Sequence, residues 1–277
     1  MRYLLALLAV VALLAIGAGG DLQAAPSPSQ GTDAGHPGAA GSRLAGAGLA
    51  EGIPWAGAVL PQLPEAAGPR SATISRGPAT RRVVHLSFDA GADRGYAESI
   101  LNTLAEEGVP ASFGMTGRWA QAHPDLIQRM AAEGHQLINH TWDHRSFTGL
   151  SDRRGRQNVA QIHQQLERTE ALLVELTGQS TKPFFRPPYG DYDNAALEAT
   201  YSAGYAYNTM WTVDSFGWRR IPAADIVARC LRLAEPGAII LMHVGIESLD
   251  GPALPSLIAR LREQGYGMVS MADLFAP

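Results

Sequence analysis

From Arg81 onwards, short runs of β-forming residues alternate with longer runs of helical periodicity. The first short run covers 83–88, and the helical pattern after it places Ile100 and Leu104 on one face before the next short run at 111–115. When each strand is followed by a helix, the helix carries the chain back to the same edge, so neighbouring strands run parallel. This alternation constrains the fold more than any other feature of the sequence.

The same pattern continues to the C-terminus. We expect further strands at 136–139, 183–185, 205–213, 238–242 and 267–269, and helices at 124–132, 154–176, 194–203, 223–233 and 254–264. So many βα units in one domain indicate closure of the sheet rather than an open sheet. The sequence therefore predicts an α/β fold at 81–277, a distorted (β/α) barrel with about seven parallel strands.

The first 80 residues have a different composition. Arg2 precedes an apolar run at 4–18 that is followed by small residues, an order typical of a secretory signal peptide at 1–24 with cleavage after Ala24. The alternative is an uncleaved membrane anchor, because the run approaches the length that spans a bilayer. Residues 25–80 are rich in Ala, Gly and Pro, which predicts a disordered linker. Both interpretations place the protein outside the cytoplasm, secreted or in the cell envelope.

Charge and cysteine content exclude several classes of protein. The formal net charge of −4 and the pI near 6.1 give no basic surface of the kind that neutralises phosphates, so nucleic acid is not an expected partner. Cys230 is the only cysteine and cannot form an intramolecular disulfide. Beyond a possible N-terminal anchor we expect no membrane partner, and the oligomeric state is left open.

Five polar residues directly follow predicted strands. In a parallel barrel the carboxyl ends of the strands open onto one face, where the active sites of such folds lie. We therefore expect these side chains to converge although they are far apart in sequence. They are Asp89, His140, Arg186, Asp214 and His243.

The segment 140–144 places His140 and His144 four positions apart, so both rings can face one ion if the segment turns tightly. Neutral imidazole is a preferred ligand of Zn²⁺. Two histidines at this spacing also occur on solvated helix faces, so the pair alone leaves both interpretations open.

Five motifs together resemble the NodB-homology polysaccharide deacetylases, carbohydrate esterase family four. They occur in the order typical of the family, and the resemblance extends over residues 81–275. The motifs are LSFDAG at 86–91, HTWDH at 140–144, RPPYG at 186–190, DSFGW at 214–218 and LMH at 241–243.

The resemblance implies metal-assisted hydrolysis of acetyl groups from an N-acetylated cell-wall polysaccharide such as peptidoglycan or a chitin-like polymer. It makes Asp89 the general base that activates water, and His140 and His144 the protein ligands of a divalent metal, zinc in the first instance. It also makes Arg186 the residue that orients Asp89, and His243 the acid that protonates the leaving group.

The remaining implied roles concern the reacting acetyl group. The backbone N–H of Tyr189 would help to hold the oxyanion, and Trp218 and Leu241 would line the pocket for the methyl group. Independent chemistry agrees with a separate base and acid, because an amide is a poor electrophile and an amine anion cannot leave.

Two positions depart from the family pattern. The family has a second aspartate, a metal ligand, where this chain has Ala90, so metal dependence is open. Three alternatives remain for the metal site. Asp93 could enter the site as the third ligand, the metal could be held by the two histidines and water alone, or Asp89 could act as a ligand as well as the base. The family also has an aspartate at the position of Gly217, where it pairs with the acid, so here His243 must be tuned by Asp214 or another group.

These departures leave alternatives for the function. An O-acetyl xylan esterase belongs to the same chemical class. A glycan-binding protein on a catalytically decayed deacetylase fold belongs to another class, and it is motivated by Ala90 and Gly217. The acetylated glycan polymer is the expected partner in each case, but the sequence does not identify the glycan or the acetyl position.

Overall fold

In the computed structural model the described residues are Leu63, 68–90 and 93–276. The description below concerns the unit Ala50–Pro277. The expected signal peptide and most of the expected linker lie outside the described residues. Within the described part of the chain, no helix is both long and apolar enough to span a membrane.

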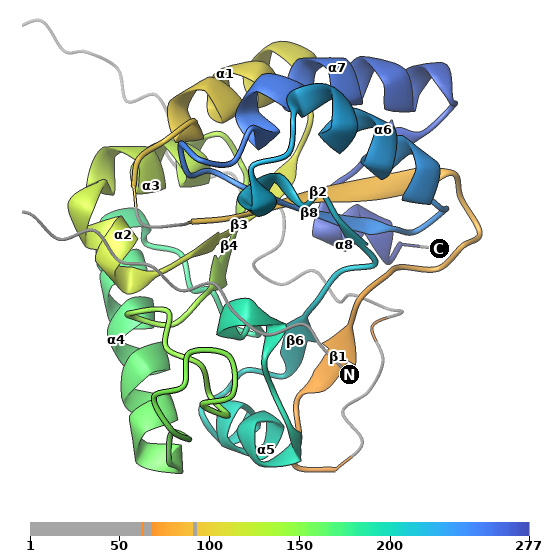
Figure 1. The fold of residues 1–277 in the computed structure, drawn as a ribbon. Helices are drawn as coiled ribbons and strands as arrows, with labels where there is room; N and C mark the ends of the chain where they lie inside the picture. The colour runs from red at the N-terminus through yellow and green to blue at the C-terminus, as the bar shows by residue number, and fades with distance from the viewer. Residues whose placement is uncertain (1–62, 64–67, 91–92, 277) are drawn as a thin grey trace, which may run out of the picture. The chain divides into compact units, whose positions relative to one another are not determined.

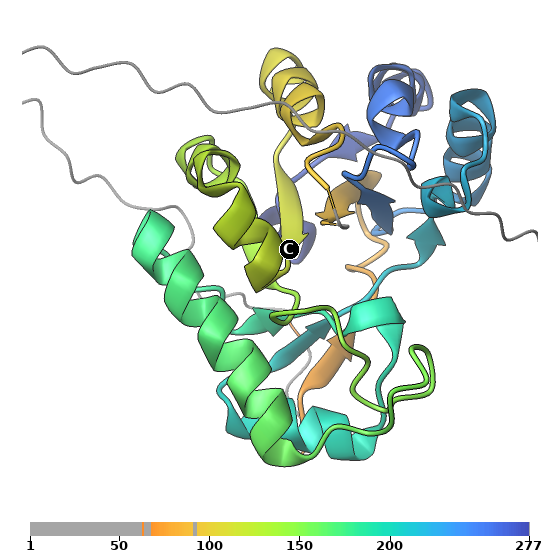
Figure 2. The same cartoon turned by 60° about the vertical axis from the view of Figure 1, so that its left-hand side comes forward.

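A curled sheet of nine strands forms the centre of this unit (Figures 1 and 2). Each pairing between its strands is parallel, as the βα alternation predicts. The order is β1-β6-β5-β4-β3-β2-β8-β7, and β9 pairs with β2. The strands are β1 Ala72–Ile74, β2 Val83–Asp89, β3 Ala111–Met115, β4 Gln136–Asn139, β5 Phe184–Phe185, β6 Tyr207–Thr209, β7 Val213–Asp214, β8 Ile239–His243 and β9 Gly267–Met268.

Helices cover the outside of the curled sheet (Figure 2). The apolar faces of most of them pack on β2, β3 and β8 in one core, in which Leu86, Phe113 and Leu257 are fully buried, while α5 and α8 contribute to two smaller clusters. The helices are α1 Ala97–Glu107, α2 Gly117–Ala122, α3 Pro124–Ala132, α4 Val159–Thr177, α5 Asn194–Ser202, α6 Ala223–Leu233, α7 Asp250–Glu263 and α8 Met271–Leu274, with 3₁₀ turns at Pro188–Gly190 and Gly217–Arg219. The predicted parallel α/β barrel is confirmed.

The expected strand at 205–213 is wrong in one informative respect. The chain forms two short strands instead, β6 beside β1 and β7 at the opposite end of the strand order. Between them, the N–H of Met210 donates to the carbonyl of Ile74 and the N–H of Thr212 donates to that of Ile239. One segment of the chain therefore crosses from one end of the sheet to the other and brings the two ends together.

The sheet also begins earlier than the composition indicates. Strand β1 lies inside the stretch expected to be a linker, and it pairs with β6 from Ala72 to Ile74. The Ser71 hydroxyl donates to the carbonyl of Tyr205, and Ile74 is buried. The predicted boundary at residue 81 is therefore too late, because a three-residue strand among Gly and Pro leaves little compositional signal.

The carboxyl ends of the central strands meet at one place. Asp89 ends β2 and His243 ends β8, and the two are direct partners in the register of these neighbouring strands. On the other side of β2, Asp89 is the partner of Gly114 in β3. Partners in adjacent strands lie about 4.8 Å apart, so the sheet itself brings residues 89 and 243 together.

Candidate active site

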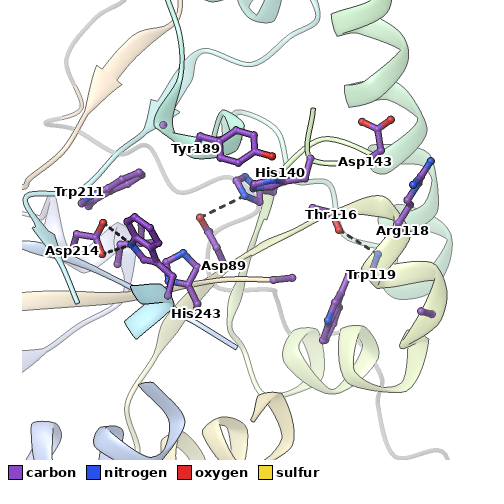
Figure 3. Close-up of a pocket in the computed structure, with 16 residues that line it drawn as sticks. Asp89, Thr116, Arg118, Trp119, His140, Asp143, Tyr189, Trp211, Asp214 and His243 are labelled. Atoms are coloured by element: carbon purple, nitrogen blue, oxygen red, sulfur yellow. Dashed lines mark hydrogen bonds and ion pairs between the residues drawn. The ribbon is translucent and has the colours of Figure 1, made fainter. Parts of the chain in front are cut away.

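A pocket of about 670 Å³ opens at these strand ends (Figure 3). Trp218 and Leu241, expected to face the acetyl methyl group, lie in its wall, as do Ala90, Arg118, Trp119 and Trp211. Six of the seven predicted site residues also line it. They are Asp89, His140, His144, Tyr189, Asp214 and His243.

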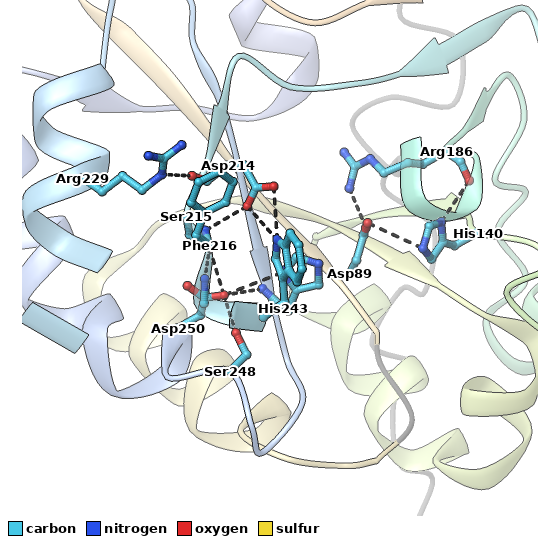
Figure 4. A network of polar contacts seen from close by, with 12 residues as sticks. Asp89, His140, Arg186, Asp214, Ser215, Phe216, Arg229, His243, Ser248 and Asp250 are labelled. Atoms are coloured by element: carbon cyan, nitrogen blue, oxygen red, sulfur yellow. Dashed lines mark hydrogen bonds and ion pairs between the residues drawn. The ribbon is translucent and has the colours of Figure 1, made fainter. Parts of the chain in front are cut away.

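The seventh, Arg186, lies fully buried beneath the pocket and organises it (Figure 4). Its guanidinium donates to Asp89 Oδ1 at 2.5 Å, to the Ser87 hydroxyl at 2.8 Å and to the carbonyl of Thr209 at 2.8 Å. Its own carbonyl accepts a hydrogen bond from His140 Nδ1 at 2.9 Å. One residue thus fixes both the candidate base and a candidate metal ligand, in agreement with the predicted contact to Asp89.

The charge of Asp89 follows from this contact. Burial alone would raise the pKa of its carboxyl, but the positive charge of Arg186, helped by His140 and His243, lowers the pKa below its ordinary value. The carboxylate is therefore ionised at neutral pH. Its second oxygen, Oδ2, lies 3.6 Å from His140 Nε2 and is free to accept a proton from water.

Gly114 makes room for this ion pair, a requirement that the sequence analysis missed. A Cβ atom at position 114 would lie less than 3.0 Å from Asp89 Oδ1 and 3.5 Å from the Arg186 guanidinium. Strand β3 approaches the carboxylate so closely that only hydrogen fits there. A glycine inside a predicted strand is the signal that could have indicated such an approach.

The two candidate metal ligands lie together. The rings of His140 and His144 are 4.8 Å apart, and His144 also packs against the ring of Tyr189 at 4.5 Å. Burial lowers the pKa of His140, and it lowers that of His144 to about 3, so both rings are neutral at pH 7. His140 Nδ1 donates to a carbonyl, so the proton of the neutral ring is on Nδ1. The lone pair is therefore on Nε2, the nitrogen that lies toward Asp89. Neutral rings with a fixed tautomer suit metal ligation.

The backbone of the motif loops is held in an uncommon conformation. Thr141, His144, Tyr189 and Phe216 all have φ between 59° and 67°, the left-handed region that side chains other than glycine rarely adopt. All four belong to the loops that follow β4, β5 and β7. Such strain persists where the surrounding structure fixes a functional geometry, which supports a functional role for these loops.

The third metal ligand of the family is missing here. Ala90 is buried at the pocket wall and offers only a methyl group. The alternative in which Asp93 enters the site does not occur in this structure, where Asp93 Oδ1 accepts from the N–H of Ile246 at 2.9 Å. Across the described ranges, no cluster of three or more His, Cys, Asp or Glu side chains is arranged to hold a metal. The donors present fit a metal through two imidazoles only.

The sequence left open whether Asp214 or another group tunes His243, and in the structure the nearest carboxylate is another one. The Asp214 carboxylate accepts from the Trp218 indole at 3.2 Å and from the N–H of Phe216 at 2.8 Å. The carboxylate beside the His243 ring is that of Asp250, whose Oδ2 lies 3.8 Å from Nδ1. Asp250 lies seven residues beyond the last motif, and the sequence analysis missed it.

Several carboxylates together determine the charge of His243. Burial alone would lower the pKa of its imidazole, but Asp250, Asp89 and Asp214 outweigh burial and raise it above the ordinary value. The site therefore holds a carboxylate with a lowered pKa beside an imidazole with a raised pKa. A carboxylate base beside an imidazole acid can catalyse the hydrolysis of an amide or ester.

Comparisons with known proteins agree with this chemistry. Residues 76–208 match the family model of polysaccharide deacetylases. The peptidoglycan-N-acetylglucosamine deacetylase of Bacillus cereus is 30% identical over 202 residues, which cover 72% of this chain and 70% of that protein. The peptidoglycan-N-acetylmuramic acid deacetylase PdaA of Bacillus subtilis is 30% identical over 199 residues, which cover 70% and 71% of the two chains.

A solved structure adds a contrasting relative. A CE4 family pseudoenzyme from Bacillus anthracis superposes with a TM-score of 0.66 and 27% identity, over 74% of this chain and 69% of that one. A mutant of that pseudoenzyme, described as having restored enzymatic activity, superposes with the same TM-score. The fold therefore occurs in both active and inactive relatives.

Proposed function

The chain belongs to the polysaccharide deacetylase family, and from this premise we propose that it hydrolyses acetyl groups from an N-acetylated cell-wall polysaccharide, peptidoglycan before chitin-like polymers. The proposal depends most on one observation. Asp89, which the ion pair with Arg186 keeps ionised, lies directly opposite His243 in the register of the neighbouring strand. The polymer named for two relatives supports peptidoglycan as the first choice.

In the proposed reaction Asp89 removes a proton from water, and the water oxygen attacks the acetyl carbonyl carbon. The developing negative charge on the carbonyl oxygen is met by the backbone N–H of Tyr189. When the carbon–nitrogen bond breaks, His243 gives its proton to the leaving nitrogen, so that acetate and a free amine result. Trp218 and Leu241 exclude water around the methyl group.

We assign a divalent metal, zinc in the first instance, to His140 and His144. A cation there would supply Lewis-acid polarisation of the acetyl carbonyl. Two neutral imidazoles without a carboxylate ligand make a weaker site than three protein ligands do. We therefore expect the protein to bind zinc weakly enough that a chelator removes the metal readily.

The proposal places the enzyme outside the cytoplasm, where its polymer is. The apolar run at 4–18 and the small residues after it support export. Cleavage after Ala24 would release the protein, and an uncleaved run would anchor it in the envelope.

Acetate release is the direct test. The purified protein is incubated with peptidoglycan, N-acetylglucosamine oligomers and acetylated xylan, with chelator and with added zinc. We expect release from peptidoglycan, a loss with chelator, and a fall of at least about 100-fold in the Asp89→Asn variant. Asp93→Asn is the matched control, since its carboxylate is close in sequence but bonded to Ile246. Release from xylan alone would make the protein an esterase.

A second candidate is a glycan-binding protein whose catalytic site has decayed. Ala90 in the place of a ligand favours it, and the pseudoenzyme with the same fold shows that such relatives exist. It predicts that binding to peptidoglycan survives chelator and the His140→Ala change while no polymer releases acetate. Turnover of any acetylated glycan by the folded protein would exclude it.

A further inference from the structure

The carboxylate of Asp250 lies fully buried below His243, at the first residue of α7 (Figure 4). Its Oδ2 accepts three hydrogen bonds, from the Ser248 hydroxyl at 2.7 Å, the N–H of His243 at 2.8 Å and the Ser215 hydroxyl at 3.1 Å. These donors fix the carboxylate against the loops after β7 and β8. In the described ranges its one ionisable partner is His243, and no Lys or Arg pairs with it.

Two polar atoms at this contact lack partners. His243 Nδ1 and Asp250 Oδ1 are both buried, and neither has a hydrogen-bond partner among the described residues. Nδ1 lies 3.8 Å from Oδ2 of the same carboxylate, about one ångström beyond hydrogen-bonding distance. Buried polar atoms without partners are costly, and a small rotation of the imidazole would pair these two groups.

Gly217 explains why the carboxylate comes from Asp250. A Cβ atom at position 217 would lie within 3.0 Å of Asp250 Oδ2, Asp250 Cγ and the Ser248 hydroxyl. The space beside His243 therefore holds the side chain of residue 250 or a side chain at 217, but not both. The two positions are 33 residues apart, and the fold brings them to the same point.

We propose that Asp250 is the positioning residue of His243, accepting a hydrogen bond from Nδ1–H so that Nε2 faces the leaving group, and that it does so from the space left by Gly217. The inference rests on the proposed function for the role of His243. It assigns to α7 a carboxylate that the motif at 214–218 does not supply. In other catalytic sites too, a carboxylate that accepts from one ring nitrogen of a histidine fixes the tautomer and orients the other nitrogen toward the substrate.

The other carboxylates near His243 are committed elsewhere. Asp89 is paired with Arg186, and Asp214 accepts from the indole of Trp218. Both act on the imidazole through their charge alone, whereas the Asp250 carboxylate also lies beside the buried Nδ1, with Oδ2 at 3.8 Å. Removing Asp250 should therefore change the orientation of His243 as well as its protonation.

The first test compares Asp250→Asn with Asp225→Asn. Asp225 is also in the first turn of a helix, α6, but it is exposed and has no contact with His243. In the Asp250→Asn protein we expect kcat to fall about 10-fold to 100-fold with KM little changed, as when a partner that orients a functional histidine is lost. The alkaline limb of the kcat profile should move to lower pH, because the acid must be protonated and has lost a group that raises its pKa.

NMR titration of the His243 imidazole gives a readout that does not need activity. The pKa of His243 should fall in folded Asp250→Asn protein and stay unchanged in Asp225→Asn protein. If no glycan releases acetate, the proposed function fails while this titration still decides the inference. An unchanged His243 pKa in folded Asp250→Asn protein would overturn it.

The second test moves the carboxylate. Gly217→Asp alone should inactivate or destabilise the protein, because two side chains would compete for one space. In a Ser248→Ala, Asp250→Ala background, which clears that space, adding Gly217→Asp should recover at least about tenfold in kcat and return the alkaline limb towards higher pH. No recovery in a folded triple variant, judged by thermal unfolding, would contradict the shared position.

Discussion

At the scale of single residues, the site depends on close approaches that leave no free volume. Gly114 is the clearest case, because Asp89 Oδ1 occupies the place where a Cβ atom would be. We expect Gly114→Ala to displace the carboxylate from Arg186, to cost at least about 2 kcal/mol of unfolding free energy and to reduce acetate release by at least about tenfold. Urea unfolding and the acetate assay measure both effects.

A double-mutant cycle separates this clash from a general effect on β3. In an Asp89→Ala background the obstructing oxygen is absent, so the stability cost of Gly114→Ala should shrink to less than half. An equal cost in both backgrounds would show that the glycine serves the strand and not the carboxylate.

Ala90 is the residue at which metal affinity can be tested. Its position beside Asp89 in the pocket wall is the one that lacks a carboxylate. We expect Ala90→Asp to tighten zinc binding by at least about tenfold in calorimetry, because a carboxylate completes three protein ligands. Ala122→Asp is the matched control, since it adds the same charge at an exposed position of the same pocket. Equal tightening in both variants would indicate a nonspecific effect of charge.

At the scale of elements, strand β1 is part of the barrel although its sequence resembles a linker. It pairs with β6, buries Ile74 and anchors Ser71 on the carbonyl of Tyr205. We expect a protein that begins at Arg81 to be less stable by at least about 2 kcal/mol than one that begins at Gly68, from the lost apolar burial alone. Urea unfolding of the two proteins measures the difference, and equal stabilities would show that β1 is dispensable.

Elements with a strong period could be predicted from the sequence, and those fixed by tertiary contacts could not. The strands at 111–115 and 136–139 and the helices at 124–132 and 223–233 have the expected bounds, because short buried runs between helices and apolar helix faces are local signals. The run at 205–213 contains Tyr, Thr, Trp and Val, which favour one continuous strand, so its sequence does not reveal that the N–H groups of Met210 and Thr212 donate to opposite ends of the sheet.

The same distinction applies to the site. Residues directly after strands, such as Asp89 and His243, were predictable because parallel strands bring their carboxyl ends together. Asp250 was not, because its approach to His243 depends on how the loop after β8 folds back and on the absence of a side chain at Gly217. The position of Asp93 could not be decided from the sequence for a similar reason, since its partner, Ile246, belongs to that same loop.

At the scale of the whole molecule, catalysis and stability depend on keeping imidazoles neutral in the interior. Burial lowers the pKa of His135, His140 and His144, and it lowers that of His85 to about 4. An unfolded histidine binds a proton below about pH 6.5, whereas these native rings do not. Between pH 6.5 and each lowered pKa the unfolded state therefore binds more protons, so stability decreases as the pH falls.

His243 and Asp89 also make stability depend on pH, but in other pH ranges. The raised pKa of His243 contributes stability below about pH 6.5 that is lost as the pH rises through its folded value. The lowered pKa of Asp89 contributes stability above about pH 3.9 that is lost only in stronger acid. Below pH 6.5 His243 is protonated in both states and adds no further change, so the histidines with lowered pKa values make the net effect of acid between pH 6.5 and 4.5 destabilising.

We expect the unfolding free energy in urea, measured at constant ionic strength, to fall by several kcal/mol between pH 7 and pH 4.5. His85 alone should contribute on the order of 3 kcal/mol of this loss when the pH reaches its folded pKa. His85 lies away from the pocket, between the carbonyl of Val269 and the Ser112 hydroxyl. The His85→Asn variant should therefore lose part of the pH dependence, and a stability that is flat from pH 7 to 4.5 would show that the buried rings take up protons without unfolding.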